Sequence, residues 1–457
     1  MSVAHSAVVQ PQDIAAPPSQ PIVQPAAYFK QAETQLCPID ADDFLTAQRE
    51  LDPEQLVAEV LRRNPSLQAM VAAWQAAAQR YPQVVSLEDP MLSLAMGPGT
   101  FGDPNHDVAW MVEGSQKIPW CGKRDLRGRQ AQAEASAAHW DVDDAELRLV
   151  ESTKLALLDY YLVRRDLALN AEGLRLAQGF RETADSHYRN NLVTQQDILQ
   201  ADLELSELRR RQFELERMDR VAAARINTLL HRPADQLLPP PPSRLPEIAA
   251  APPLQVVEQF ASERRPDLMA LGARLRAEQA AVAIAERDYY PDLDVVGRYD
   301  GFWQGADRNL APLVGVNLNV PLDNERRRAA IREAQFRANQ RRAELEAKLD
   351  EVQGDVAIAY RQLEESRRTI ELFEMSILPV AEQNLASAQS NYTANKIDFL
   401  RLIEAARQSV MLREKREEAL ADYHRRLAEL ERASAGPILP SPAETIPPGP
   451  TPSRKPQ

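Results

Sequence analysis

The sequence has few aromatic residues, two cysteines and no long apolar run. Aromatic residues make up 6% of the 457 residues, which is little for a chain that must fill a round globular core. No apolar run reaches the ~18 residues of a membrane-spanning helix, so none is predicted. The formal net charge is −13, which excludes the basic surface of a nucleic-acid-binding protein. We therefore expect no nucleic acid among the partners.

Residues that could build a catalytic or metal site are equally scarce. Cys37 and Cys121 lie far apart and the six histidines are scattered, so no zinc spacing or imidazole cluster occurs. No Ser-His-Asp, Cys-His or paired-carboxylate pattern and no glycine-rich phosphate loop is present. We expect no enzymatic activity, no cofactor and no metal site. The first thirty residues also lack the basic start and apolar core of a signal peptide.

The composition and the prolines predict how the chain is organised. Ala, Leu, Glu, Gln and Arg are abundant, as in long helices and coiled coils. Proline-rich stretches separate the helical regions from each other and from the tail. We predict a disordered or extended N-terminal segment (1–50), a first structural repeat (51–232), a Pro-rich connector (233–253), a second structural repeat (254–435) and a disordered Pro-rich tail (436–457).

The two repeats are predicted because similar residues recur in the same order about 200 positions apart. "RNPSLQAM" returns as "RRPDLMAL", and "YRNNLVTQQDILQ" returns as "YTANKIDFLRL". A run of matches in one order is most simply explained by two copies of one structural unit. The paired residues are Pro65 and Pro266, Pro82 and Pro291, Pro119 and Pro321, Tyr160 and Tyr360, Tyr188 and Tyr392, and Asp197 and Asp398.

Each repeat is predicted to contain a helix, two strands and a long helical hairpin. Alternation of apolar and polar residues predicts strands at 91–96, 108–118, 293–300 and 313–320, each with one apolar face. Helices are predicted at 54–80, 122–189 and 195–230 in the first repeat, and at 254–289, 322–378 and 397–434 in the second. Gly173 and Pro379 are expected to weaken the two long helices at corresponding places.

The recurring Tyr-Asn-Asp segments suit the turns of these hairpins. Asn191 and Asn395 are expected in the left-handed conformation that ends helices. Asp197 and Asp398 then lie where the returning helices begin, and carboxylates stabilise helix N-termini. Thr194 is a candidate N-cap for the first returning helix. The tyrosines that precede the asparagines, Tyr188 and Tyr392, are expected to pack at the end of each interhelical seam.

Four strands with one apolar face cannot close a barrel alone. An open apolar sheet is a liability in water, and membrane barrels begin at about eight strands. Three chains with four strands each would supply twelve. In such a barrel Trp110, Trp120, Phe302 and Trp303 could lie at the membrane interface. Ordinary packing at strand ends is the alternative explanation for these aromatic residues.

With these motifs in place, the sequence resembles the TolC-like outer membrane efflux protein family, closest to its heavy-metal cation branches. "YTANKIDFLRLIEAARQ" is similar to the family pattern Tyr-x-x-Gly-Lys-x-Asp-Phe-Leu-x-Leu-Leu-Asp-Ala-x-Arg, with Asn in place of Gly. "YRNNLVTQQDIL" and "IPWCGKR" also resemble family segments. The matching residues are Tyr188, Asn191, Asp197 and Leu199 in the first tip; Tyr392, Asn395, Lys396, Asp398, Phe399, Leu400 and Arg407 in the second; and Pro119, Gly122, Lys123 and Arg124 after the second strand.

The resemblance implies a mainly α fold with a small β part. Tandem helical hairpins would form a helical barrel, and four strands per chain would complete a trimeric 12-stranded outer membrane β-barrel. The implied partners are two further copies of the chain, outer membrane lipid, a periplasmic adaptor protein and an inner-membrane pump. The implied role of the tip residues is gating and adaptor docking, and the implied location is the outer membrane, extending into the periplasm.

Two functions follow from this reading of the sequence. The first is a passive outer membrane duct that exports substrates, either heavy-metal cations or drugs, that a pump delivers. The alternative is a soluble coiled-coil scaffold of helical hairpins that never enters a membrane. The absence of a visible signal peptide favours the scaffold. The four alternating strands favour the duct, because a coiled-coil scaffold has no use for them.

Overall fold

A computed structural model describes residues 49–98, 110–301, 312–320 and 322–438 of the chain. These residues belong to one compact unit, residues 48–457. Most of the N-terminal segment and most of the tail predicted from the sequence lie outside the described residues, as do Phe302, Trp303 and Pro321. In the described part of the chain, no helix combines the length and the apolar character needed to cross a bilayer.

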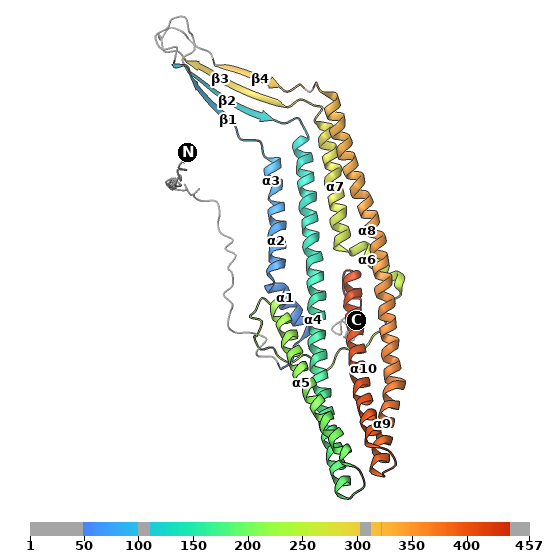
Figure 1. The fold of residues 1–457 in the computed structure, drawn as a ribbon. Coiled ribbons are helices and arrows are strands. Elements are labelled where there is room, and N and C mark those ends of the chain that lie inside the picture. The colour runs from blue at the N-terminus through green and yellow to red at the C-terminus, as the bar shows by residue number, and fades with distance from the viewer. Residues whose placement is uncertain (1–48, 99–109, 302–311, 321, 439–457) are drawn as a thin grey trace, which may run out of the picture. The chain divides into compact units, whose positions relative to one another are not determined.

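The fold is mainly helical with one small antiparallel sheet, as the sequence predicted (Figure 1). The first part contains α1 (Pro53–Arg63), α2 (Pro65–Ala78), α3 (Arg80–Val85), β1 (Met91–Met96), β2 (Trp110–Ile118), α4 (Lys123–Arg189) and α5 (Gln195–Leu229). The second part contains α6 (Leu254–Arg264), α7 (Pro266–Arg287), β3 (Leu293–Gly301), β4 (Leu313–Leu318), α8 (Asn324–Leu372), the π-helical turn η3 (Phe373–Ile377), α9 (Leu378–Thr393) and α10 (Phe399–Ala433).

The helices predicted at 54–80 and 254–289 are each broken at a proline. Asn64 and Arg265 are extended, and Pro65 and Pro266 begin the helices that follow. A proline ring disfavours a helical conformation in the residue before it, while its fixed φ suits the first position of a helix. The Asn64 side chain caps α2 by accepting a hydrogen bond from the Ser66 N–H at 3.0 Å.

The prediction that Gly173 interrupts the first long helix is wrong. Helix α4 continues from Lys123 to Arg189, and Gly173 is buried inside it against α5. A glycine costs a helix only about 1 kcal/mol, so tertiary packing keeps the helix intact. Pro379 does coincide with an irregularity, because the π-helical turn η3 ends just before it. Such a turn accommodates a ring that would clash with the preceding helical carbonyl.

The four strands form one sheet in the order β1-β2-β3-β4, and all neighbours are antiparallel. The register places Leu94 beside Val112 and Val112 beside Tyr299. One face is therefore apolar and the other polar, as the alternation predicted. The apolar face carries Leu92, Leu94, Met96, Val112, Ile118, Leu293, Val295, Tyr299, Val314, Val316 and Leu318, and the polar face carries Ser93, Glu113, Lys117, Asp294, Arg298, Asp300 and Asn317.

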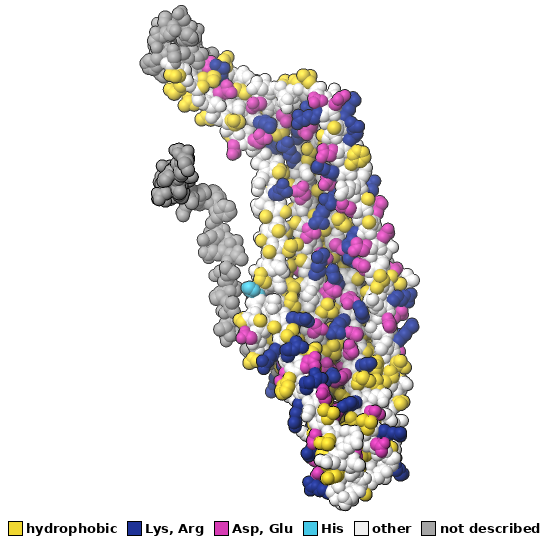
Figure 2. Space-filling model, viewed as in Figure 1, with side chains coloured by type: hydrophobic (Ala, Val, Ile, Leu, Met, Phe, Trp, Pro, Cys, Tyr) yellow, Lys and Arg dark blue, Asp and Glu magenta, His cyan; other side chains and the backbone are white. Residues whose placement is uncertain are grey.

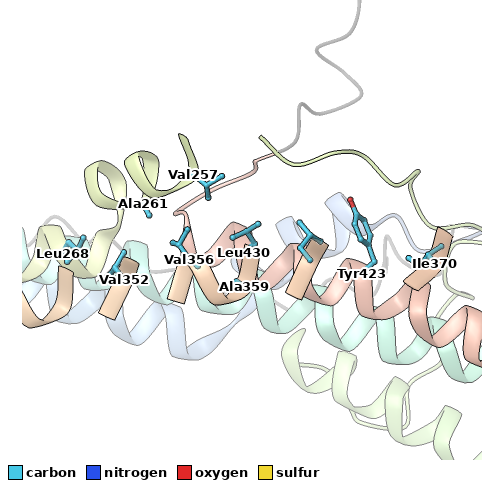
Figure 3. Packing of buried hydrophobic residues seen from close by; sticks show 11 residues of the cluster. Val257, Ala261, Leu268, Val352, Val356, Ala359, Ile370, Tyr423 and Leu430 are labelled. Atoms are coloured by element: carbon cyan, nitrogen blue, oxygen red, sulfur yellow. The ribbon is translucent and has the colours of Figure 1, made fainter. Parts of the chain in front are cut away.

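The helices pack through small and branched side chains. Figure 3 shows one such core, in which residues of α6, α8 and α10 point toward one another. The connector is anchored beside it: the Tyr423 hydroxyl donates to the Ala249 carbonyl at 2.7 Å, and the Tyr160 hydroxyl donates to the Pro239 carbonyl at 3.3 Å. Outside the core, Figure 2 shows basic and acidic side chains interspersed over the helices, where they form many ion pairs.

His424, beside Tyr423 on α10, should make stability fall in acid. Burial, with a smaller contribution from the Lys154 charge, lowers the pKa of His424 from 6.5 to about 4, against the opposing effect of the Pro246 carbonyl. An unfolded histidine takes up a proton below pH ~6.5, whereas the buried one stays neutral down to about pH 4. The unfolded state thus binds more protons in this window, and the folded state loses about 3 kcal/mol as the pH falls through it.

Urea unfolding, followed by circular dichroism at pH 7 and pH 4.5, tests this effect of His424. We compare the chain with His424→Gln, which removes the titrating ring. The difference in the free energy of unfolding between the two pH values should be smaller in the variant. Equal pH dependence of the two proteins would contradict the prediction.

Candidate functional site: the hairpin tips

The turns that end the two helical hairpins have nearly the same backbone geometry. Asn191 has φ +56° and Asn395 has φ +54°, which confirms the predicted left-handed conformation. The Asn191 N–H donates to the Tyr188 carbonyl and the Asn395 N–H to the Tyr392 carbonyl, each at 2.9 Å. These bonds satisfy carbonyls at the ends of α4 and α9 that have no partner within their own helix.

The returning helices begin at or within two residues of the predicted positions, and Thr194 is the N-cap residue as predicted, but the side-chain caps are absent. Thr194 and Asp398 are the N-cap residues of α5 and α10, but neither side chain makes a capping hydrogen bond. Asp197 lies in the first turn of α5, three residues beyond its N-cap, so it is not equivalent in position to Asp398. Both carboxylates still lie at helix N-termini, where the helix dipole favours negative charge.

Tyr392 and Phe399 join the two tips, whereas Tyr188 does not. Tyr392 is 2% exposed and its ring contacts Phe399 at a centroid distance of 5.4 Å. On its other side it stacks at 5.3 Å on His187 of the first hairpin. Tyr188 is 43% exposed, so the expectation that both tyrosines pack in a seam is correct for Tyr392 alone. The apolar cluster around Tyr392 includes residues of α4, α5, α9 and α10.

Acidic groups of the two tips face each other across this cluster. Burial raises the pKa of Asp197, and the Asp398 carboxylate raises it further. The pKa of Tyr392 is raised to about 12 by burial and by the negative charge of Asp197. In the part of the chain that the structure describes, the Tyr392 hydroxyl has no hydrogen bond of good geometry. Asp197 and Tyr392 therefore form an electrostatic contact between the hairpins.

A groove of about 660 Å³ runs between α5 and α10 above the tips. Its walls carry charged side chains, and Ala177 and Phe180 of α4 line it as well. Arg407 on α10 reaches Glu204 on α5, with 2.7 Å between Nε and Oε2. Glu204 is 7% exposed, so this ion pair connects the two hairpins at a buried carboxylate. The predicted residue Arg407 thus has a contact that spans the groove.

The remaining predicted tip residues are on the surface. Leu199 is 60% exposed and Leu400 is 50% exposed, and Lys396 is exposed beside the second turn. Exposed apolar side chains at the end of a hairpin are suited to contact another protein. The predicted tip residues therefore divide into a buried pair, Tyr392 and Phe399, and an exposed group.

The predicted strand-to-helix motif lies at the other end of α4 (Figure 1). Pro119 follows β2, and Gly122 precedes α4 with φ +87°, a conformation that favours glycine. Lys123 is 3% exposed and Arg124 is half-buried. These four residues are therefore not part of the tips.

Replacing Asn395 by Val should destabilise the second tip by about 1–2 kcal/mol, because the left-handed conformation is costly for an L-residue, above all a β-branched one. Ser390→Val is the matched control, since Ser390 is an exposed helical residue of α9. Hydrogen exchange of the tip amides reports the local opening free energy. Asn395→Gly should be tolerated, and equal effects of Val at both positions would refute the assignment.

Two residues of the site were not predicted from the sequence. Glu204 lies in the helical segment "ADLELSEL" among similar acidic residues, and His187 lies in an ordinary helical turn. Each matters because of a partner on another hairpin, about 200 residues away along the chain. The hint in the sequence was Arg407 itself, a basic residue of the predicted tip that can pair with a carboxylate of the other hairpin.

Comparison with known proteins finds partial similarity to one family model and to several bacterial proteins. Residues 258–436 match a family model described as outer membrane efflux protein. The chain is 23% identical over 289 residues to Nodulation protein T of Rhizobium leguminosarum bv. trifolii, which covers 61% of each chain. It is 25% identical over 280 residues to Outer membrane protein OprJ of Pseudomonas aeruginosa, covering 58% of this chain and 57% of OprJ. The matches thus span about 60% of these relatives.

A metal-resistance protein and a solved channel are also similar. Cobalt-zinc-cadmium resistance protein CzcC of Cupriavidus metallidurans is 29% identical over 147 residues, which is 32% of this chain and 34% of CzcC. The structure of the outer-membrane channel OprN has a TM-score of 0.71 and 20% sequence identity. That likeness covers 85% of this chain and 91% of the OprN chain. The likeness in structure concerns the fold.

Proposed function

We propose that this chain, whose residues 258–436 match the outer membrane efflux protein family, forms the outer membrane duct of an efflux system. In this proposal three copies assemble, their sheets close a 12-stranded barrel in the outer membrane, and their helices continue as a tunnel into the periplasm. The duct is passive and carries out no reaction.

The observation that carries this proposal is the exposed apolar face of an open sheet. On the edge strands, Leu92 and Val314 are each 79% exposed. The outer edges of β1 and β4 have no neighbouring strand in the described part of the chain. Because the strands alternate in direction, β4 of one copy can pair with β1 of the next in antiparallel fashion. Closure removes both edges and turns the apolar face toward lipid.

The helices support the same head-to-tail assembly. Helix α5 packs on α4, α4 packs on α10, and α10 packs on α8 and α9. The helices at the two ends of this row expose apolar side chains, which are Leu199, Leu203, Phe213 and Val221 on α5, and Ile358, Leu372, Met375 and Val380 on α8, η3 and α9. A contact between the two ends of neighbouring copies is heterologous, and it forms a ring when the rotation closes.

The partners and the substrate follow from the same proposal. We place adaptor docking at the exposed tip residues, including Leu199, Lys396 and Leu400, and we assign gating to the contact between the hairpins at Tyr392, Asp197 and Arg407. An inner-membrane pump would select the substrate. The name of CzcC, a cobalt-zinc-cadmium resistance protein, favours a metal cation, and a drug or another small molecule is the alternative substrate. A soluble scaffold would leave the apolar face of the sheet exposed to water.

Fractionation of cells that express the full chain tests the proposal. Two single variants of β4 are compared with the parent chain, one with an arginine on the apolar face and one with an arginine on the polar face. Val314→Arg puts a charge on the apolar face, which costs about 2–4 kcal/mol near the middle of a bilayer. Asn317→Arg puts the same charge on the polar face of the same strand. We expect the chain and Asn317→Arg to band with the outer membrane as cross-linkable trimers, and Val314→Arg to lose both properties. A cytosolic chain, or equal behaviour of the two variants, would refute the duct.

A further inference from the structure

Among the described residues, the sheet is attached to the helices mainly at its junctions. In the described part of the chain, the strands pack on one another, and no helix packs against a face of the sheet. The orientation of the sheet is thus set where the chain passes between helices and strands. Two of these connections lead into the sheet, residues 86–90 before β1 and residues 288–292 before β3. At the start of α4, Lys123 contacts the connection before β3, and Arg124 contacts Val85, the last residue of α3 directly before the other connection.

Lys123 holds the connection between α7 and β3. Its ammonium lies 2.9 Å from Asp292 Oδ1, 3.2 Å from the Tyr290 carbonyl and 3.3 Å from Asp288 Oδ1. An ammonium has three N–H donors, and here all three acceptors come from one short turn more than 160 residues away along the chain. Lys123 is 3% exposed, so this contact is formed almost without water.

Asp292 also ties the neighbouring strands to this turn. Its side chain accepts a hydrogen bond from the Trp120 N–H at 3.0 Å, and its backbone carbonyl accepts one from the Asn319 N–H at 3.2 Å. Burial alone would raise the pKa of Asp292, but the Trp120 N–H and the Lys123 ammonium more than offset it, and the pKa is lowered. Trp120 and Tyr290 stack at 5.5 Å beside it. The ends of β2 and β4 and the start of β3 thus meet at one ionised carboxylate.

Arg124 holds the end of α3, from which the other inbound connection starts. Its guanidinium donates to the Val85 carbonyl, with 2.7 Å from Nε. One turn further along α4, Gly128 lets α3 approach closely, since a Cβ there would lie 2.8 Å from Val85 and 3.1 Å from Tyr81. The connection itself, residues 86–90, is fixed to β2, because Gln116 Nε2 donates a hydrogen bond to the Glu88 carbonyl at 2.7 Å.

We propose that Lys123 and Arg124 are positioning residues that set the angle of the sheet relative to α4 and thereby allow three sheets to close. This inference rests on the proposed trimeric duct. A closed barrel requires each sheet to meet its neighbours with a fixed tilt and stagger. A deviation in the angle between sheet and α4 is repeated in all three copies, and the three deviations add up around the ring. A small increase in the mobility of each junction therefore prevents closure of the barrel. The two adjacent basic residues fix both inbound connections from a single helix end.

Lys123→Met tests the proposal, because it removes the ammonium and keeps most of the side-chain stem. Asp292→Asn is a milder second variant that keeps the acceptor for the Trp120 N–H. Arg129→Met is the matched control, since Arg129 lies on the same helix but is 68% exposed. We expect the trimer fraction in outer membrane lipid vesicles to fall about tenfold or more for Lys123→Met, less for Asp292→Asn and not for Arg129→Met.

A second measurement separates positioning from general stability. Spin labels at Ser93 on β1 and Gln132 on α4, in a chain with Cys37→Ser and Cys121→Ser, report the distance between sheet and helix. Labelled chains are diluted with unlabelled ones. The distance distribution should be narrow in the parent chain and broad in Lys123→Met, while the helical signal melts at the same temperature in both.

Failure of the proposed duct and failure of the positioning role of Lys123 give different results. If the parent chain forms no trimers in the vesicles, the proposed function fails. If the parent chain forms trimers and Lys123→Met forms as many, the positioning role is wrong. The role is also wrong if the distance distribution of Lys123→Met stays narrow. It is wrong, too, if Lys123→Met and Asp292→Asn both lower the melting temperature of the helices in proportion to the loss of trimer. Lys123 would then be a general stabilising residue.

Discussion

Replacing Phe399 by Ala is expected to destabilise the joined hairpin tips by about 3–5 kcal/mol, the usual cost of truncating a buried phenylalanine. Phe399 is 1% exposed and contacts the Tyr392 ring. The cluster around it contains residues from both hairpins. The variant should therefore loosen the contact between the hairpins and not only the second turn.

Hydrogen exchange of the amides at 399–405 and 180–187 measures this effect, because it reports local opening free energies within an assembled protein. Leu400→Ala is the matched control: Leu400 is the next residue and is 50% exposed. We expect a change of less than about 1 kcal/mol for Leu400→Ala. If Leu400 docks the adaptor, this control should bind the adaptor less tightly while its tip stays folded. Equal protection in the parent chain and Phe399→Ala would contradict the prediction.

Replacing Glu417 by Ala is expected to lower the free energy of unfolding by about 3 kcal/mol. The variant removes a buried carboxylate and leaves its hydrogen-bonding and charged partners unpaired. Glu417 is 5% exposed and accepts a hydrogen bond from the Tyr161 hydroxyl at 3.0 Å. Its carboxylate also lies 3.1 Å from Arg165 and 2.9 Å from Arg416. Both arginines are partly exposed, 39% and 29%, so water can replace some of the lost contact. The cost is therefore placed at the lower end of the range for buried pairs.

An exposed glutamate provides the comparison for Glu417. Glu333 pairs with Arg337 on α8, and the two side chains are 62% and 63% exposed. Glu333→Ala should change the free energy of unfolding by no more than about 0.5 kcal/mol, as is usual for surface ion pairs. Urea unfolding monitored by circular dichroism measures both variants in the same detergent. A Glu417→Ala variant as stable as Glu333→Ala would show that the buried pair is energetically neutral.

The network around Glu417 also connects the two hairpins. Tyr161 and Arg165 belong to α4, Glu417 belongs to α10, and Arg416 continues to Glu374 in the π-helical turn at 2.8 Å. Burial raises the pKa of Tyr161 to about 12, and the charge of Glu417 contributes to the rise. The tyrosine hydroxyl therefore stays protonated at physiological pH and can always donate its hydrogen bond.

Local features of this protein follow from its sequence because they depend on neighbouring residues. Alternation of apolar and polar side chains identified all four strands and both faces of the sheet, since the period of a strand is two. The left-handed turns at Asn191 and Asn395 follow from a backbone preference of asparagine. The same rules of local geometry could have placed the breaks at Pro65 and Pro266, because a proline restricts the residue that precedes it.

Other features depend on which segments meet in space. Tyr188 and Tyr392 occupy equivalent places before similar turns, yet Tyr392 is buried because His187 and Phe399 cover it, and Tyr188 has no such neighbours. Gly173 does not break α4, because packing against α5 supplies more energy than the weak helix propensity of glycine removes.

The ionic contacts at Lys123, Glu204 and Glu417 could not be read from local pattern at all. Each joins segments more than 160 residues apart, and the sequence contains many similar lysines and glutamates on exposed helix faces. A charge becomes structurally important when burial removes water from it and leaves only specific protein partners to compensate. Burial is a property of the packed helices, so these contacts depend on how the hairpins and the sheet junctions come together in the tertiary structure.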